Sequence, residues 1–428
     1  MPVPQLSSAR LQIPSLRWWI IALLFIATLI NFLDRLTISV LATPICESLH
    51  LTNEQFAHIN IWFLAAYTLS QGLSGKIYDR IGVKKGFAGS ITLWSAAAMA
   101  HAFAVGLNSL SVLRAFLGLG EAGNWPGATK IIAEWFPIRE RAFAMSIVNS
   151  GTSLGSVIAP PLIVWLNFAF GWQAAFLVTG ALGFLWLGVW LNFYQPFAAH
   201  SALTEEERVL IESDQPVSSA ADSEETTPWT WWQLAKYRQV WAILLARLFV
   251  DPIWWLYILW LPKYLGSERH LSLEQAGWGT SVPFLAAALG GFLGGGGSGF
   301  FIRRGWTVNR ARKTFILIGC VFMPAGIFAP YCSNVVSALA CISLVTFGFQ
   351  FWVNNVQTLP SDIFPKHAVA TVAGIGGFGA GIGSIIFTQT TGWVVDHFSY
   401  TPIIITAGLL APLGTLILLT LLGEVKRV

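Results

Sequence analysis

The most constraining feature of this chain is a series of apolar windows, each roughly 20 residues long, that recurs along almost its whole length. A helix of that length crosses ~30 Å of hydrocarbon at ~1.5 Å per residue. Only 11% of the 428 residues are charged, whereas soluble domains carry about 25%. The sequence therefore predicts an all-α membrane protein with about twelve transmembrane helices, near 18–42, 57–75, 86–106, 110–132, 143–166, 173–194, 240–264, 276–301, 312–331, 335–358, 369–393 and 400–422.

The basic residues predict how the chain is oriented. With an even number of spans and both ends inside, 19 of the 25 Lys and Arg fall in cytoplasmic segments, and Lys263 and Arg269 fall outside. The remaining four lie within the spans: Arg35, Arg114, Lys130 and Arg247. The net charge of +4 therefore encodes orientation and gives no reason to expect a nucleic-acid partner. The first window follows Arg17 and is too long for a signal-peptide core, so we expect it to be retained.

A polar stretch at 195–238 divides the chain into two halves. It contains Thr204 followed by three glutamates, a capping-box start for a short helix, and ends in a tryptophan-rich segment suited to the headgroup region. We predict a cytoplasmic N-terminus (1–17), a six-helix bundle (18–194), a cytoplasmic linker with short amphipathic helices (195–238), a second six-helix bundle (239–422) and a cytoplasmic C-terminus (423–428).

The two halves repeat each other in their cytoplasmic turns. GKIYDRIG at 75–82 is answered by GFFIRRG at 299–305, and EWFPIRERA at 134–142 by DIFPKHA at 362–368. Parallel repeats of this kind build transporters that rock about a site between the halves near the bilayer midplane.

Together with these turns, three blocks resemble the major facilitator superfamily and, within it, the anion:cation symporter family: NFLDR at 31–35, RAFLGLGEAG at 114–123 and the 134–142 turn. ARLFVDPIW at 246–254 and VAGIGGFG at 372–379 look most like bacterial hexuronate (galacturonate and glucuronate) transporters. The resemblance implies the major facilitator fold and location in a bacterial inner membrane. It also implies proton coupling through Asp34 and Glu121, and substrate contact by Arg35, Tyr67 and Arg114.

Charged residues inside the spans support a transport site independently, because each costs at least ~2.5 kcal/mol to insert. Arg114 and Glu121 are seven residues apart, so they share a helix face, and neighbouring glycines allow the close helix packing that favours a protonated carboxyl. Asp34 and Arg35 can lie at a level similar to Arg114, where opposite charges can meet. A static packing pair between Arg114 and Glu121 is the structural alternative.

A second charged pair lies in the second half. Arg247 and Asp251 are spaced i,i+4 and can pair directly beside Pro252, which suits either a gate or a purely structural role. Lys130 and Glu134 have the same spacing at the cytoplasmic end of their span, where we expect a snorkelling lysine.

Further side chains suit a polyhydroxylated anion. An arginine fork holds a carboxylate with two parallel bonds, which makes Arg35 or Arg114 the candidate clamp. Hydroxyl groups need amide and phenol partners, and the candidates within the spans are Tyr67, Gln71, Asn149, Gln350, Asn354 and Asn355.

Two positions depart from the related sugar-acid transporters. Phe32 stands where they often carry tyrosine, and Gly377 where galactonate-type members carry asparagine. The missing tyrosine hydroxyl and the missing side-chain amide favour a hexuronate over galactonate as the substrate. We expect no metal and no cofactor, because the four cysteines show no ligand spacing; protons are the expected coupling ion.

We therefore predict a monomeric transporter, not an enzyme, that imports a small organic anion with protons. Another organic anion (an aldonate, glucarate, an aromatic acid or a dicarboxylate), sodium coupling, and a receptor or channel are alternatives. An intramembrane hydrolase built on Ser153 is another, because GTSLG at 151–155 matches a serine-hydrolase pattern. That pattern and the dinucleotide-like GIGGFG at 374–379 both require a strand before a helix, which an apolar span does not supply.

Overall fold

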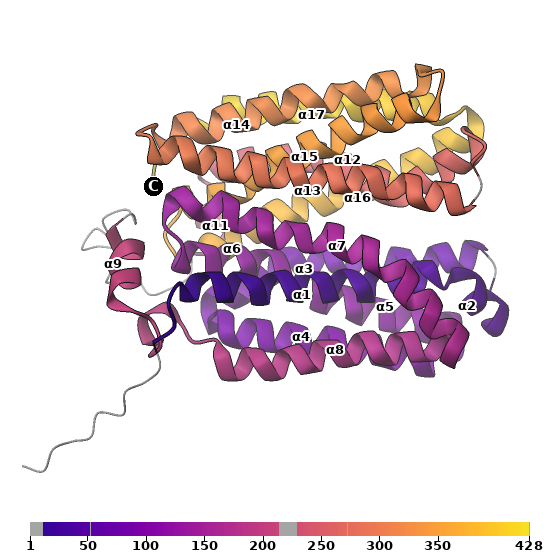
Figure 1. Cartoon of the computed structure of the whole chain (residues 1–428), viewed down its shortest axis with the longest axis horizontal. Helices are drawn as coiled ribbons and strands as arrows, with labels where there is room; N and C mark the ends of the chain where they lie inside the picture. The colour runs from indigo at the N-terminus through magenta and orange to yellow at the C-terminus, as the bar shows by residue number, and fades with distance from the viewer. Residues whose placement is uncertain (1–11, 52, 214–228, 272, 428) are drawn as a thin grey trace, which may run out of the picture.

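The chain is seen in a computed structural model that describes residues 12–51, 53–213, 229–271 and 273–427. The described residues form helices and no strands. Twelve rods run side by side along the long axis of the molecule (Figure 1). They are α1 (Leu16–Val40), α3 (Asn53–Ile81), α4 (Val83–Ala100), α5 (Leu107–Glu121) with α6 (Asn124–Trp135), α7 (Ile138–Phe170), α8 (Trp172–Phe193), α12 (Arg238–Ser267), α13 (Leu273–Arg303), α14 (Val308–Phe322) with the 3-10 helix η3 (Met323–Tyr331), α15 (Val335–Ile363), α16 (Val369–His397) and α17 (Tyr400–Leu422).

The rods form two bundles of six, one from each half of the chain (Figure 1). The C-terminal bundle has its own apolar core, and the N-terminal bundle has two clusters. The bundles meet mainly where α3 packs on α16 and α7 on α13. The linker helix α9 (Glu205–Ser213) and the C-terminus lie at the same end of the molecule, which we call the linker end (Figure 1).

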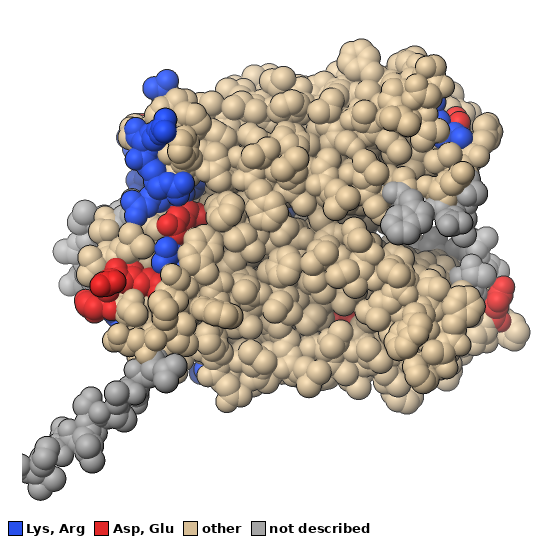
Figure 2. Space-filling model, in the orientation of Figure 1, with Lys and Arg blue, Asp and Glu red and all other residues tan. Residues whose placement is uncertain are grey.

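The surface matches a membrane protein. Figure 2 shows a flank with almost no charged side chains, and lysines and arginines gathered at the linker end. Large apolar side chains on the flank are exposed, such as Phe168 at 84% and Leu185 at 69%. Among the described residues, nine helices are long and apolar enough to cross a membrane. The other three rods are α3 and α4, which are less apolar, and the α5/α6 pair, whose two helices are each shorter (15 and 12 residues). They lie among the nine (Figure 1).

Two predicted spans are not continuous α-helices, which corrects the windows at 110–132 and 312–331. The first breaks after Glu121 and restarts as α6 at Asn124, and Pro126 in the first turn of α6 has no N–H to donate to the carbonyl of Ala122. The second changes from α-helix to 3-10 helix after Phe322, where Pro324 removes another backbone donor. Glu121 is therefore the last residue of its helix.

The linker contains short helices where the sequence predicts them. Thr204 Oγ1 accepts a bond from the Glu207 N–H (3.3 Å) at the start of α9, as its capping-box pattern indicates. The tryptophan-rich segment forms α11 (Trp231–Leu234), and the Trp232 side chain is 85% exposed. The polar residues 214–228 between these helices lie outside the described residues.

Candidate functional site

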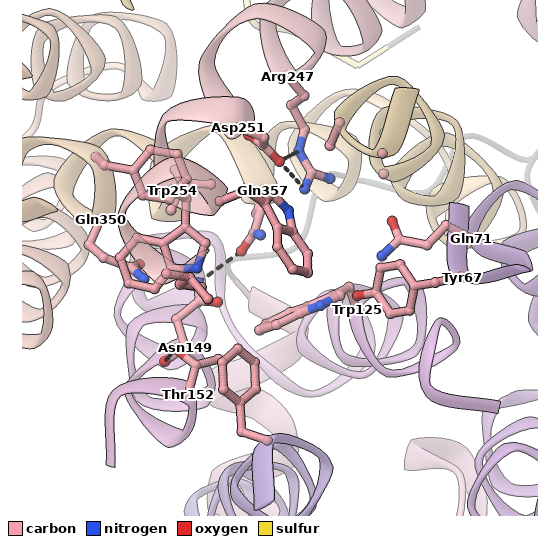
Figure 3. Close-up of a pocket in the computed structure, with 18 of the residues that line it drawn as sticks. Tyr67, Gln71, Trp125, Asn149, Thr152, Arg247, Asp251, Trp254, Gln350 and Gln357 are labelled. Atoms are coloured by element: carbon pink, nitrogen blue, oxygen red, sulfur yellow. Dashed lines mark hydrogen bonds and ion pairs between the residues drawn. The ribbon is translucent and has the colours of Figure 1, made fainter. Parts of the chain in front are cut away.

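A polar cavity lies between the two bundles and takes side chains from both. It encloses about 660 Å³ of space between atoms, part of it open to solvent, and Figure 3 shows how its labelled side chains converge from the two halves. Its lining residues are Phe32, Arg35, Leu64, Tyr67, Gln71, Trp125, Asn149 and Thr152 from the first half, and Arg247, Asp251, Trp254, Trp255, Ile258, Phe349, Gln350, Val353, Gln357, Gly377, Ala380 and Gly381 from the second.

The N-terminal wall of this cavity carries an arginine paired to a fully buried carboxylate. Arg35 donates from Nε (2.9 Å) and Nη2 (2.7 Å) to the same oxygen, Oε2, of Glu121. The Arg35 guanidinium lies 4.9 Å from the ring centres of both Phe32 and Tyr67. Glu121 is 0% exposed, and its second oxygen, Oε1, has no hydrogen-bond partner among the described residues.

Glycines allow the helix that carries Glu121 to pack closely against α3 and α4. A Cβ on Gly118 would lie 2.5 Å from the Phe63 carbonyl oxygen of α3, and one on Gly120 would lie 2.7 Å from the Trp94 backbone nitrogen of α4. Larger residues at these positions would therefore push α5 away from its neighbours. The close packing expected around Glu121 is present.

The other two charges of this group lie elsewhere. Arg114, expected beside Glu121 or Asp34, instead donates to the Asn60 side chain (3.0 Å) and does not line the cavity. Asp34 is also buried off the cavity, and its carboxylate accepts no hydrogen bond from the described residues. The expected meeting of Arg114 with the α1 charges was wrong. Arg114 bonds to Asn60 of α3. Arg35 of α1 bonds instead to Glu121, which lies two turns further along α5.

Amide side chains line the middle of the cavity. Asn149 donates to the side-chain oxygens of Asn354 (2.6 Å) and Gln357 (2.8 Å), which links α7 to α15 across the two halves. The Oε1 atoms of Gln71 and Gln350 are buried at the cavity without a donor among the described residues. A buried acceptor without a donor is costly, so these oxygens suit the hydroxyl groups of a ligand.

Two of the predicted contacts are structural in this conformation. Asn354 accepts from Asn149 and donates to the Gln350 carbonyl oxygen (2.7 Å), while Asn355 donates to the Gly294 and Phe351 carbonyl oxygens at 3.2 and 3.0 Å. Neither lines the cavity. The sequence alone could not distinguish Asn354 and Asn355 from Gln350, because which face of a helix points into a cavity depends on the helices packed around it.

The C-terminal wall carries the second ion pair. Arg247 donates from Nε (3.0 Å) and Nη2 (2.6 Å) to Oδ2 of Asp251, so the pair predicted from the i,i+4 spacing is present. Asp251 Oδ1 has no donor among the described residues. Helix α12 runs through Pro252 without a break.

The linker end is closed by bonds between the halves. Arg141 of α7 donates to the Ser361 carbonyl oxygen (2.6 Å) and pairs with Asp362, which also pairs with Arg312 (2.8 Å). Arg312 in turn donates to the Ile138 carbonyl oxygen (3.0 Å). These contacts join the two halves at the linker end.

A second set of contacts between the halves involves Lys130 and corrects the prediction for that residue. Its ammonium group is buried and pairs with Asp79 (2.7 Å), because α3 places that carboxylate beside it; it does not snorkel to the membrane surface. Asp79 also accepts from the N–H (2.7 Å) and hydroxyl (2.6 Å) of Thr371, near the N-terminus of α16 in the other half.

Several lining residues were not predicted, among them Trp125, Thr152 and Gln357. Thr152 is one turn after Asn149 on α7, and Gln357 is one turn after Val353 on α15, so helical spacing could have indicated both. No spacing rule could have placed Trp125, which follows the break after Glu121.

The two enzyme-like patterns both lie within helices. Ser153 is in the middle of α7, and the glycines at 374–379 lie in α16, where Gly374 and Gly379 pack close to the Gln71 and Leu244 carbonyl oxygens. These glycines therefore serve helix packing.

Comparisons with known proteins agree with this architecture. The model of the Major Facilitator Superfamily matches residues 24–388. The chain is 32% identical over 417 residues to the hexuronate transporter of Escherichia coli (strain K12), covering 96% of this chain and 95% of that one. It is 33% identical over 335 residues to the galacturonate transporter of Dickeya chrysanthemi, covering 78% of this chain and 96% of the relative.

A solved structure supports the fold alone. The proton:xylose symporter XylE bound to 6-bromo-6-deoxy-D-glucose matches with a TM-score of 0.75 at 15% identity, over 96% of this chain and 97% of that one. The fold and the site together define a membrane transporter built from two bundles around a central cavity. The chain belongs to the Major Facilitator Superfamily, as the sequence resemblance predicted.

Proposed function

We propose that this protein imports a hexuronate, galacturonate or glucuronate, together with protons. The observation that carries the proposal is the Arg35–Glu121 pair at the wall of a polar cavity between the halves. A guanidinium can hold a carboxylate with two parallel bonds, and here two of its three nitrogens, Nε and Nη2, are occupied by a carboxylate that can take up a proton. The names of the relatives, hexuronate and galacturonate transporter, support a sugar-acid substrate.

The proposed cycle begins with protonation of Glu121 from the outer side. The neutral acid releases Arg35, which then binds the carboxylate of the sugar acid. Gln71, Asn149 and Gln350 bind its hydroxyl groups. The halves rock, the bonds at the linker end open, and loss of the proton to the cytoplasm restores the Arg35–Glu121 pair and displaces the substrate.

Asp34 remains a second candidate for a transported proton. It is 1% exposed, and a carboxylate that accepts no hydrogen bond is costly to keep charged in an apolar environment. Arg114 and Tyr67 remain candidates for substrate contact, Tyr67 from the cavity wall and Arg114 only after a rearrangement.

The linker end is proposed to face the cytoplasm of a bacterium, with the protein in the inner membrane as a monomer. The concentration of lysines and arginines at this end supports the orientation (Figure 2). The Arg141, Arg312 and Asp79 contacts, which join the halves at this end, would have to open for release into the cytoplasm.

The test is uptake of labelled galacturonate and glucuronate into proteoliposomes under an inward proton gradient. Accumulation that an uncoupler abolishes is the expected result. Absence of accumulation of either sugar acid would reject the hexuronate assignment, and accumulation driven by sodium would reject proton coupling.

A different organic anion is the second candidate, because relatives are also named D-galactonate and galactarate/D-glucarate transporters. Competition by galactonate and glucarate against labelled galacturonate separates these substrates. We expect galactonate to compete weakly, since Gly377 offers no side-chain amide to the cavity.

A further inference from the structure

Arg247 lies between two spaces in the protein, and only one of them is the central cavity. A smaller space of about 280 Å³ shares Arg247, Trp125 and Gln357 with it. Its other lining residues lie closer to the linker end: Thr129, Ile243, Val356, Pro360 and Ala373. Arg247 thus forms part of the partition between the cavity and the route toward the linker end.

The two cavity arginines stand at different depths. Both α1 and α12 start at the linker end (Figure 1). Arg35 is 19 residues from the first residue of its helix, and Arg247 is nine residues from the first residue of its own. At ~1.5 Å per residue, Arg247 lies about 15 Å closer to the linker end.

Arg247 also has donor capacity to spare. Both of its bonds to Asp251 go to one oxygen, Oδ2, and the Nη1 nitrogen makes no hydrogen bond to the described residues. A carboxylate could therefore bind at Nη1 while Asp251 keeps its own bonds to the guanidinium.

We propose that Arg247 is a second, weaker binding position for the carboxylate of the substrate, occupied after Arg35 and before release at the linker end. This inference rests on the proposed uptake of hexuronates. The substrate meets a net positive charge at Arg35 when Glu121 is protonated. It meets a neutral pair at Arg247, because Asp251 stays charged. A second position of low affinity shortens the distance that the substrate must cross unbound between Arg35 and the cytoplasm, and it does not retain the anion.

Two variants have opposite expected effects. Asp251→Asn leaves Arg247 without its counter-charge, so the linker-side half-saturation should fall by roughly tenfold to a thousandfold, and release should slow. The double variant Arg247→Gln with Asp251→Asn removes both charges at once, a change that buried pairs often tolerate. It should raise the linker-side half-saturation about tenfold and the outer-side value by a smaller factor, because Arg247 also lines the central cavity.

The measurement is uptake of labelled galacturonate into right-side-out and inverted membrane vesicles, which report the outer and linker sides separately. Shifts of opposite direction in the two variants that are larger in inverted than in right-side-out vesicles support the second position. Equal shifts in both vesicle types, or none in either, overturn it. If Asp251→Asn fails to fold, judged by its melting temperature in detergent, the double variant alone decides.

Failure of the proposed function gives a different result. Wild-type vesicles that transport no hexuronate reject the substrate assignment, and the second position with it. Wild-type transport combined with equal shifts in the variants rejects only the second position.

Discussion

Replacing Glu121 by glutamine should uncouple transport from the proton gradient. The amide can still accept a bond from Arg35, so the fold of the site is kept, but it cannot carry a proton. One pH unit is worth about 1.36 kcal/mol per proton, or tenfold in concentration. With the membrane potential clamped at zero and one proton carried by Glu121, a gradient of one unit should concentrate the substrate about tenfold in the wild type. The variant should lose that factor.

The assay is the slope of log accumulation against the imposed pH difference in proteoliposomes, with counterflow exchange measured alongside. Glu121→Gln should lower the slope by one and leave exchange intact, because exchange needs no net proton movement. The matched control is Glu140→Gln, which makes the same chemical change at a carboxylate that pairs with Arg17 (3.0 Å) outside the cavity. An unchanged slope in Glu121→Gln would refute the reasoning, and the same assay on Asp34→Asn shows whether a second carboxyl carries a proton.

Two further substitutions test the cavity and the closed end. Gly377→Ala would place a Cβ 2.7 Å from Cδ of Gln71 and against its oxygen, so that side chain must move. We expect the half-saturation for galacturonate uptake to rise roughly two- to tenfold, the value of one neutral hydrogen bond, and an unchanged value would contradict a role for Gln71. Asp79→Asn breaks a buried pair with Lys130, a change that costs ~3–5 kcal/mol. It should lower the melting temperature in detergent by several degrees, and a temperature equal to that of the wild type would show that the pair contributes nothing to the closed state.

The fold could be predicted because its signal is long and repeated. Twelve apolar windows and the two duplicated turns determine the number of rods and their division into two bundles before any contact is known. The breaks in α5/α6 and α14/η3 were missed because hydropathy averages over a window, whereas one proline, such as Pro126, acts on one backbone bond.

The site could be predicted only in part, for a similar reason. Arg35, Glu121, Arg247 and Asp251 stand out because a charge inside a span is costly wherever its partner is. Which charges pair depends on side-chain reach between helices, and spacing along one helix cannot give that. Arg114 illustrates this point, since it is on the same helix as Glu121 and bonds to α3 instead.

The pairing of Arg35 with Glu121 explains how one proton could control anion binding. Two unit charges ~4 Å apart interact by about 4 kcal/mol at an effective dielectric constant of 20. When Glu121 is charged, it repels an incoming carboxylate at Arg35 with an energy of about this size. With Glu121 neutral, that repulsion is absent. The difference corresponds to roughly a thousandfold in affinity, so an unprotonated carrier would rarely hold substrate and little anion would leak uncoupled. At Arg247 the charge of Asp251 persists throughout, which is why we assign tight binding to the first arginine and release to the second.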